Sequence, residues 1–305
     1  MNGMVAGAVV LVAAIAAAPQ TFKVAVEGVR VDVLVTEGRR IVAGLTAADF
    51  ELTDSGVAQA IESVSLEDAP LSVMLVLDTS ASVRGAPLAH LKEAASAVVD
   101  LLQRGDRAAL ATFSGAALLE CDWTGDRRKL HAAIDQVEAG GATALHDAVY
   151  AALMLRDPSP GRPLVLVFSD GADTASWLPG ARVVNVVQRN DAVVYAVTLG
   201  GPETLPLGYL ADFTSGIQQR LDNIAPAAFR QSFIESLADQ SGGVVVPAGR
   251  SSELRETFVK VVTEFRSRYV LTYMPRGVEA SGWHPLEVRV KKKSAKVTVR
   301  RGYLR

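Results

Sequence analysis

Hydrophobic and polar residues alternate in two different ways along the chain. Near its start, valines at every second position, such as Val29, Val31 and Val33, predict antiparallel strands with one buried face. In the central part, short apolar runs such as residues 71–77 and 164–168 alternate with segments of helical periodicity. Apolar runs bounded by polar turns are typical of strands that are covered on both faces. We therefore expect a doubly wound α/β unit with a mostly parallel, Rossmann-like sheet.

The same periodicities place the individual elements. We predict helices at residues 88–102, 130–137, 144–155 and 254–265, and strands at residues 71–77, 108–113, 116–122, 164–168 and 192–199. Alternation with a period of two returns near the end of the chain, at residues 269–273, 286–290 and 296–299. Neither end has enough strands to bury a core by itself. The two ends are therefore expected to pair into one small β-sandwich, into which the α/β unit is inserted.

These patterns divide the chain into four parts. They are a signal peptide at 1–18, an N-terminal β segment at 19–67, the α/β domain at 68–269 and a C-terminal β segment at 270–305. The apolar stretch at the start has the length of a signal-peptide core and is too short to span a membrane. It is preceded by no Lys or Arg, so an uncleaved anchor stays open as an alternative. We expect a secreted, periplasmic or cell-surface protein without a stable membrane span after signal removal.

Composition narrows the classes of partner. The chain has 305 residues, 49% of them hydrophobic, which is enough for a large core and a smaller second one. A net charge of −2 gives no general attraction to nucleic acid, and we expect no such partner. The basic end, residues 288–305, alternates charges with valines, which favours a strand with a charged solvent face. The single cysteine, Cys121, excludes an intramolecular disulfide and is expected to be a buried structural thiol.

Five oxygen-bearing residues follow the ends of predicted buried strands or lie in a glycine loop. They are Asp78, Ser80, Ser82, Thr143 and Asp170. An open parallel sheet binds its ligands at the carboxyl edge, where we expect these side chains to form a rim. Mg²⁺ prefers oxygen ligands in near-octahedral geometry, whereas sulfur and imidazole favour zinc. Taken singly, each residue is more typical of a helix cap or a turn. Together they predict a site for Mg²⁺, or for Mn²⁺ or Ca²⁺.

This set resembles the metal-ion-dependent adhesion site of von Willebrand factor type A domains. The resemblance rests on DTSAS at residues 78–82, on Thr143 in GGATAL and on Asp170 in SDG, in the family's order. It implies that Ser80, Ser82 and the threonine coordinate the ion, with the two aspartates often acting through water. We expect Asp147, in the helix after the glycine loop, to support that loop.

The flanking segments carry a second resemblance. Residues 29–65, the segment RYVLTYMP and the terminal VTVRRGYLR are similar to bacterial secreted proteins of the acidobacterial type called VWFA-related. The resemblance implies a divalent-cation-dependent protein-binding or adhesion module of the bacterial envelope or exterior. Its ion would accept an Asp or Glu carboxylate from a protein partner. Residues 200–224 are too long for an ordinary connection, and either shape partner recognition or are an incidental surface excursion.

Two other function classes stay open. One is a structural envelope protein whose metal site only stabilises the loops. The other is a hydrolase that uses the ion as a Lewis acid. The neighbourhood of the motif has no convincing nucleophile–base pair, no G-x-S-x-G elbow and no phosphate loop, so we expect no enzyme activity.

Overall fold

The structure is a computed structural model that describes residues 28–66, 69–159, 161–169, 173–199 and 233–305. The predicted signal peptide, Asp170 and the long connection at 200–224 lie outside these residues. Within the described residues, no helix is both long and apolar enough to cross a membrane.

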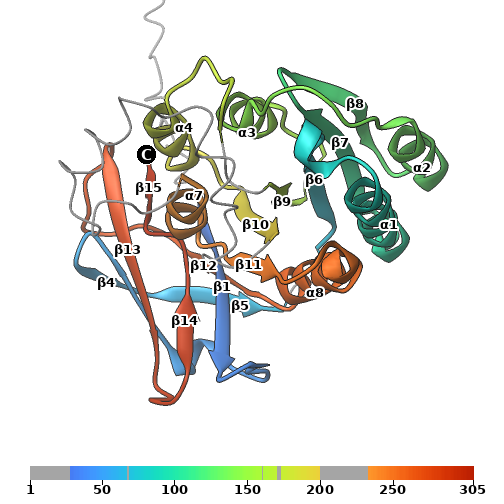
Figure 1. Cartoon of the computed structure of the whole chain (residues 1–305). Coiled ribbons are helices and arrows are strands. Elements are labelled where there is room, and N and C mark those ends of the chain that lie inside the picture. The colour runs from blue at the N-terminus through green and yellow to red at the C-terminus, as the bar shows by residue number, and fades with distance from the viewer. Residues whose placement is uncertain (1–27, 67–68, 160, 170–172, 200–232) are drawn as a thin grey trace, which may run out of the picture.

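A six-stranded sheet forms the core of the α/β unit (Figure 1). Its order is β11-β10-β9-β6-β7-β8, and all neighbours are parallel except β8, which runs antiparallel to β7. The strands are β6 (Leu71–Asp78), β7 (Arg107–Phe113), β8 (Ala117–Thr124), β9 (Arg162–Phe168), β10 (Val193–Leu199) and β11 (Val245–Ala248). Every residue of β6 is buried, because the strand is central and helices cover both faces of the sheet.

Helices lie on both faces of this sheet (Figure 1). One face packs against α1 (Ala86–Leu101), α2 (Arg127–Gln136) and α8 (Leu254–Arg266), and the other against α3 (Leu145–Met154), α4 (Gly180–Val187) and α7 (Phe233–Ser241). Each face has its own buried cluster, with Leu91 and Phe258 in the first and Val149 and Leu237 in the second. The predicted α/β class with a mostly parallel, doubly wound sheet is confirmed.

Cys121 is less buried than the sequence predicts. It lies in β8, the antiparallel strand at the edge of the sheet, and its side chain is only partly buried. Burial still raises the pKa of the thiol. The predicted burial of this thiol is therefore only partial: Cys121 packs against a core cluster, but no residue of its strand is fully buried.

Strands from the two ends of the chain pair with each other. One sheet has the order β14-β1-β12-β5, with β2 added to β1, and the other has the order β15-β13-β3-β4. The N-terminal strands are β1 (Val29–Glu37), β2 (Arg40–Ile41), β3 (Phe50–Asp54), β4 (Val57–Gln59) and β5 (Ile61–Ser65). The C-terminal strands are β12 (Tyr269–Tyr273), β13 (Trp283–Val290), β14 (Lys296–Thr298) and β15 (Gly302–Leu304). Neither end forms its sheets alone.

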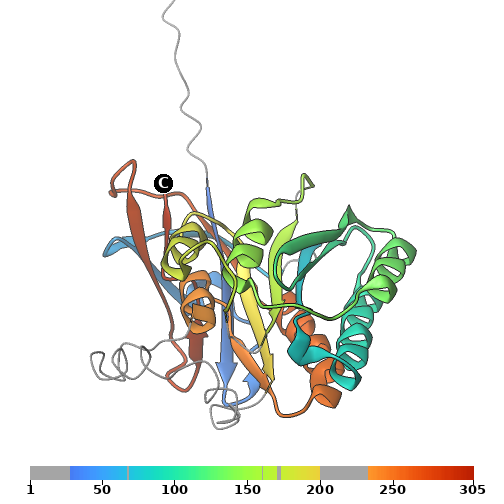
Figure 2. The ribbon, with the colours of Figure 1, turned by 45° about the horizontal axis from the view of Figure 1, so that its top comes forward.

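These two sheets share one buried cluster, which includes Val33, Leu52 and Val288. Figure 2 shows their strands beside the α/β unit. The alternating valines at the start of the chain therefore face a core that both ends of the chain build. That the two sheets form an independent β-sandwich stays a prediction.

Charged residues connect the two sheets built from the ends of the chain, here called the flank sheets, to the α/β unit. Arg162, in β9, is almost wholly buried, and its Nη2 lies 2.5 Å from Asp32 Oδ1 in β1. Arg301 Nη2 lies 2.6 Å from Asp239 Oδ1 in α7, and Arg300 Nη2 donates to Asn190 O at 2.9 Å. β13 has the predicted alternation of buried and exposed residues. Arg300, which is half-buried, departs from the predicted solvent face, whereas Arg301 is exposed although it also contacts the α/β unit.

Candidate metal centre

The order in which the chain adds strands to the sheet reverses between β6 and β9, which is the switch point of the sheet. The chain leaves β6 toward β7 on one side and leaves β9 toward β10 on the other. Ligands of open α/β sheets bind beyond the carboxyl ends of the strands at such a point. Asp78 ends β6 and Ser169 follows β9, and Ser169 Oγ donates to Asp78 Oδ2 at 3.0 Å. A hydrogen bond between two predicted strand ends therefore closes the base of this crevice.

Asp78 is 0% exposed. Its Oδ1 accepts a hydrogen bond from the backbone N–H of Ser80 at 2.9 Å, and the chain then curls into the short 3₁₀ helix η2 (Ala81–Val83). The expectation that Asp78 lies at the rim is wrong. Its carboxylate lies beneath the loop because hydrogen bonds from Ser80 and Ser169 hold it between two strands. Sequence reasoning missed Ser169, although its place directly before Asp170 at a strand end was a usable signal.

Ser80 and Ser82 project from this curled loop toward each other. The two hydroxyls form a hydrogen bond with each other, with 2.9 Å between their oxygens, and Ser80 is buried whereas Ser82 is exposed. Two oxygens at neighbouring corners of an octahedron, each about 2.1 Å from Mg²⁺, are about 3.0 Å apart. The two hydroxyls therefore have the spacing of adjacent ligands of one ion, with Ser82 on the solvent side.

Thr143 lies in the glycine loop, residues 140–143. Backbone hydrogen bonds attach this loop to the serine loop, residues 79–82. Gly140 N donates to Thr79 O at 2.7 Å, and Ala81 N donates to Gly141 O at 3.1 Å. Gly141 has a φ of +87°, in the left-handed region that glycine adopts without strain. Thr143 itself is 8% exposed, so it is more buried than a rim position implies. The structure thus brings the loops of Asp78, the two serines and Thr143 together.

A further loop, residues 173–178, is attached to Thr143. The N–H of Thr143 donates to Thr174 Oγ1 at 3.0 Å. In return, Thr143 O accepts from the N–H groups of Thr174 at 2.8 Å and Ala175 at 3.0 Å. The backbone of Thr143 is therefore fixed from both sides, and the segment that follows Asp170 in the chain provides the contacts.

Two carboxylates hold the shape of the 173–178 loop. Asp147, in the first turn of α3, accepts from the N–H groups of Trp177 at 2.9 Å and Leu178 at 3.0 Å. Asp173 Oδ1 accepts from Ser176 Oγ at 2.6 Å. The hydrogen bonds of the Asp147 carboxylate thus go to this neighbouring loop and not to the glycine loop. Short polar residues spaced as in DTAS are a turn signal that could have found this loop.

The donor set of the crevice fits a hard divalent cation. Hydroxyl and carboxylate oxygens are the ligands that Mg²⁺ and Ca²⁺ prefer. Over the part of the chain that the structure describes, no group of three or more His, Cys, Asp or Glu is placed to hold a metal. The described oxygen donors at this edge are the side chains of Ser80, Ser82 and Thr143, with Asp78 beneath the serines. Asp170 lies outside the described residues.

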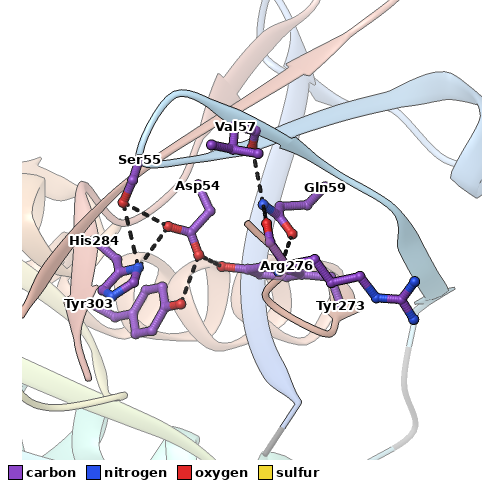
Figure 3. Close-up of polar contacts among 8 residues, drawn as sticks. All are labelled: Asp54, Ser55, Val57, Gln59, Tyr273, Arg276, His284 and Tyr303. Carbon is purple, nitrogen blue, oxygen red and sulfur yellow. Dashed lines mark hydrogen bonds and ion pairs between the residues drawn. The ribbon is translucent and has the colours of Figure 1, made fainter. Parts of the chain in front are cut away.

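A second buried polar cluster lies between the flank sheets (Figure 3). The Asp54 carboxylate accepts from the hydroxyls of Tyr273 and Tyr303 at 2.8 Å and of Ser55 at 3.0 Å, and lies 2.9 Å from His284 Nδ1. Ser55 Oγ is 3.5 Å from the same ring nitrogen. In a Ser–His–Asp catalytic triad, serine and aspartate bind opposite nitrogens of the imidazole. The arrangement is therefore not that of a catalytic triad.

The charge of Asp54 is held by its neighbours. Burial opposes ionisation, but hydrogen bonds from Tyr303, His284 and Tyr273 outweigh it, so the pKa of Asp54 lies below its ordinary value. Burial, reinforced by the nearby Asp54 carboxylate, raises the pKa of Tyr303 to about 12. Because its members come from β3, β12, β13 and β15, the cluster ties the two ends of the chain together.

Comparisons with known proteins concern the central part of the chain. Residues 73–172 match the family model described as von Willebrand factor type A domain. That range contains the serine loop and the glycine loop.

The curated relatives are distant. A UPF0353 protein of Mycolicibacterium vanbaalenii is 25% identical over 209 residues, which cover 62% of this chain and 58% of that protein. The chain thus spans less than two thirds of that relative's length. A UPF0353 protein of Mycobacterium ulcerans is 24% identical over 266 residues, which cover 80% of this chain and 74% of that protein.

Solved structures share the fold. A von Willebrand factor type A protein from Catenulispora acidiphila has a TM-score of 0.51 at 12% identity, with 89% of this chain and 72% of that chain covered. Proximal thread matrix protein 1 from the mussel byssus has a TM-score of 0.50 at 15% identity, with 76% of this chain and 50% of that chain covered. At these identities the likeness concerns the fold alone. The central part of the chain therefore matches the von Willebrand factor type A domain in sequence and shares its α/β fold.

Proposed function

We propose that the protein is a divalent-cation-dependent protein-binding module. In this proposal, Ser80, Ser82 and Thr143 hold Mg²⁺, Mn²⁺ or Ca²⁺ at the crevice, with Asp78 and Asp170 acting through water. A partner protein completes the coordination with an Asp or Glu carboxylate. The observation that carries the proposal is the 2.9 Å spacing of the Ser80 and Ser82 hydroxyls at the switch point of the sheet.

The chemistry of the donors supports a role in binding. Neutral hydroxyls neutralise little of the charge of a bound divalent cation, which therefore attracts a further anionic ligand. Asp78 fixes the backbone of Ser80, and Ser82 lies on the exposed side. The protein thus contributes a rigid, shallow set of oxygens, and a ligand from outside can approach on the side of Ser82.

The envelope or exterior is the proposed location. The apolar stretch at the start of the sequence, followed by the domain described above, supports secretion to the periplasm, the cell surface or the medium. The proposed relation to secreted proteins of the acidobacterial type rests on the flanking segments.

A capture experiment tests this proposal. The immobilised protein is exposed to an envelope extract of the source cells in Mg²⁺ and in chelator, and Ser82→Ala is carried through as a matched variant. Because Ser82 is exposed, the variant should fold normally. We expect one or more partners that are retained in Mg²⁺ and lost both in chelator and with Ser82→Ala. A partner that is retained equally in all three conditions would refute the metal-bridged mechanism.

The same experiment separates the alternatives. A structural role of the ion predicts that Mg²⁺ stabilises the fold while no partner depends on it. A hydrolase predicts turnover of generic ester or phosphate substrates that stops in chelator.

A further inference from the structure

Trp177 has an exposed side chain, although a hydrogen bond holds its backbone in place. Its side chain is 94% exposed, while its backbone N–H is bound by the Asp147 carboxylate at 2.9 Å. Tryptophan is among the residues that contribute most to binding energy in protein interfaces. A rigidly placed and solvated tryptophan is therefore a candidate anchor for a partner.

A groove begins beside this residue. It lies between α3 and α4, on the face of the sheet that also carries α7 (Figure 1), and has a volume of about 630 Å³. Its apolar walls include Tyr150, Leu178, Pro179 and Val186. Because Leu178 and Pro179 follow Trp177 directly in the chain, the tryptophan lies next to one wall of the groove.

The charged side chains among the described lining residues of the groove are all positive. Arg182 and Arg189 line it, both are exposed, and neither forms an ion pair with any residue that the structure describes. None of the described lining residues is acidic. Arginine binds carboxylates with its planar fork of donors, so two such groups beside apolar walls complement an acidic segment that also carries an apolar side chain.

The groove is also connected to the candidate metal edge. Thr143 O accepts hydrogen bonds from Thr174 and Ala175, which lie three and two residues before the tryptophan. Asp147, which holds Trp177, lies in the first turn of α3, the helix that starts two residues after Thr143. The candidate metal edge and the groove are therefore joined through one loop, residues 173–178.

We propose that the groove between α3 and α4 binds an extended acidic segment of the partner protein. Acidic side chains of that segment pair with Arg182 and Arg189, and an apolar side chain lies against Tyr150 and Leu178. Trp177 packs on the segment between the groove and the crevice. This inference rests on the proposed function, since the same partner supplies the carboxylate to the ion.

The test uses a display library of random peptides of about twelve residues, selected on the full chain in Mg²⁺. We expect the selected peptides to combine two or more acidic residues with an apolar one. Their affinity should fall about tenfold or more for the Arg182→Glu/Arg189→Glu variant and for Trp177→Ala. The matched control is Arg255→Glu/Lys260→Glu, which makes the same charge change at exposed positions of α8 on the opposite face. This control should bind the peptides like the wild type.

Thermal unfolding of the same variants separates this inference from the proposed function. The groove variants should keep the stabilisation by Mg²⁺, because none of their changes touches the crevice. Selected peptides without acidic residues, or unchanged affinity in the arginine variant, would overturn the groove while leaving the metal proposal intact. A wild type that gains no stability from Mg²⁺, but loses the peptides in the arginine variant, would overturn the metal proposal and leave the groove.

Discussion

Asp54 and Asp78 are both 0% exposed, yet their surroundings differ. Asp54 is enclosed by side chains from three strands of the flank sheets and by Ser55 of the adjacent turn, and the hydroxyls of Tyr273, Tyr303 and Ser55 all donate to it (Figure 3). Asp78 accepts from a backbone N–H and from Ser169, and the loop that it orients ends at exposed Ser82. The Asp54 carboxylate therefore lies within the core of the flank sheets, whereas the Asp78 carboxylate lies beneath a surface loop.

The difference shows how a buried charge is assigned a role. A buried carboxylate is tolerated when hydrogen bonds replace the water it has lost. Around Asp54 those bonds join distant parts of the chain, so the charge stabilises the fold. Around Asp78 they fix a loop whose hydroxyls have the spacing of metal ligands, so we propose that this charge prepares a metal site. Substitutions at Asp54 and at Ser82 separate these two roles.

The largest effect is expected at the closed cluster. Asp54→Ala leaves the hydroxyls of Tyr273 and Tyr303 and the imidazole of His284 without their acceptor, and should lower the free energy of unfolding by about 3–5 kcal/mol. Urea unfolding measures this loss. A loss below about 1 kcal/mol would show that the cluster does not tie the ends of the chain together.

The next effect is expected at the crevice. Mg²⁺ at about 100 times its dissociation constant should raise the free energy of unfolding by roughly 2.7 kcal/mol, and chelator should remove this increment. Asp54→Asn should keep the increment, because the flank cluster takes no part in the site. Thermal midpoints that do not change over a Mg²⁺ titration of the wild type would contradict the expectation.

A fall in pH should also reveal how much the ionised Asp54 carboxylate contributes to the stability of the fold. Because its pKa is lower in the folded protein than the ordinary value of 3.8, its contribution to stability is complete above that value. The contribution should be lost as the pH falls through the lower folded pKa. The comparison is urea unfolding of the wild type and Asp54→Asn between neutral pH and about pH 3. Parallel curves for the two proteins would refute this assignment.

The smallest effect is expected from Ser82→Ala in chelator. The side chain is exposed, so the substitution should change the free energy of unfolding by no more than about 0.5 kcal/mol. In Mg²⁺ the same variant should lack most of the increment seen in the wild type. A large loss in chelator would instead assign Ser82 to the fold.

The positions of Asp78, Ser80 and Ser82 at the carboxyl end of β6 could be predicted from the sequence, because a buried apolar run places its last residues at that edge of a parallel sheet. The burial of Asp78 could not, since it depends on Ser169 from a different strand. The Asp54 cluster was invisible for the same reason: residues 54, 273, 284 and 303 meet only after the ends of the chain pair.

Three elements of the α/β unit also escaped sequence analysis. Helix α4 has only eight residues, so its periodicity is too short to stand out. β11 is a four-residue edge strand that contains Pro247, a residue that weakens the strand signal. α7 begins at Phe233, a short distance after the stretch at 200–224 that was treated as a connection. Short elements at the margins of the sheet carry little periodic information, whereas the central strands carry most of it.

Titration with Mn²⁺, followed by electron paramagnetic resonance, tests the central claim most directly. The free and bound ion differ in signal, so the measurement counts sites without any partner. The account predicts one Mn²⁺ per wild-type chain, displaced by Mg²⁺, and greatly weakened binding in Ser80→Ala/Ser82→Ala, with Asp54→Asn unchanged. Absence of bound Mn²⁺ in the wild type, or equal binding by the double serine variant, would contradict it.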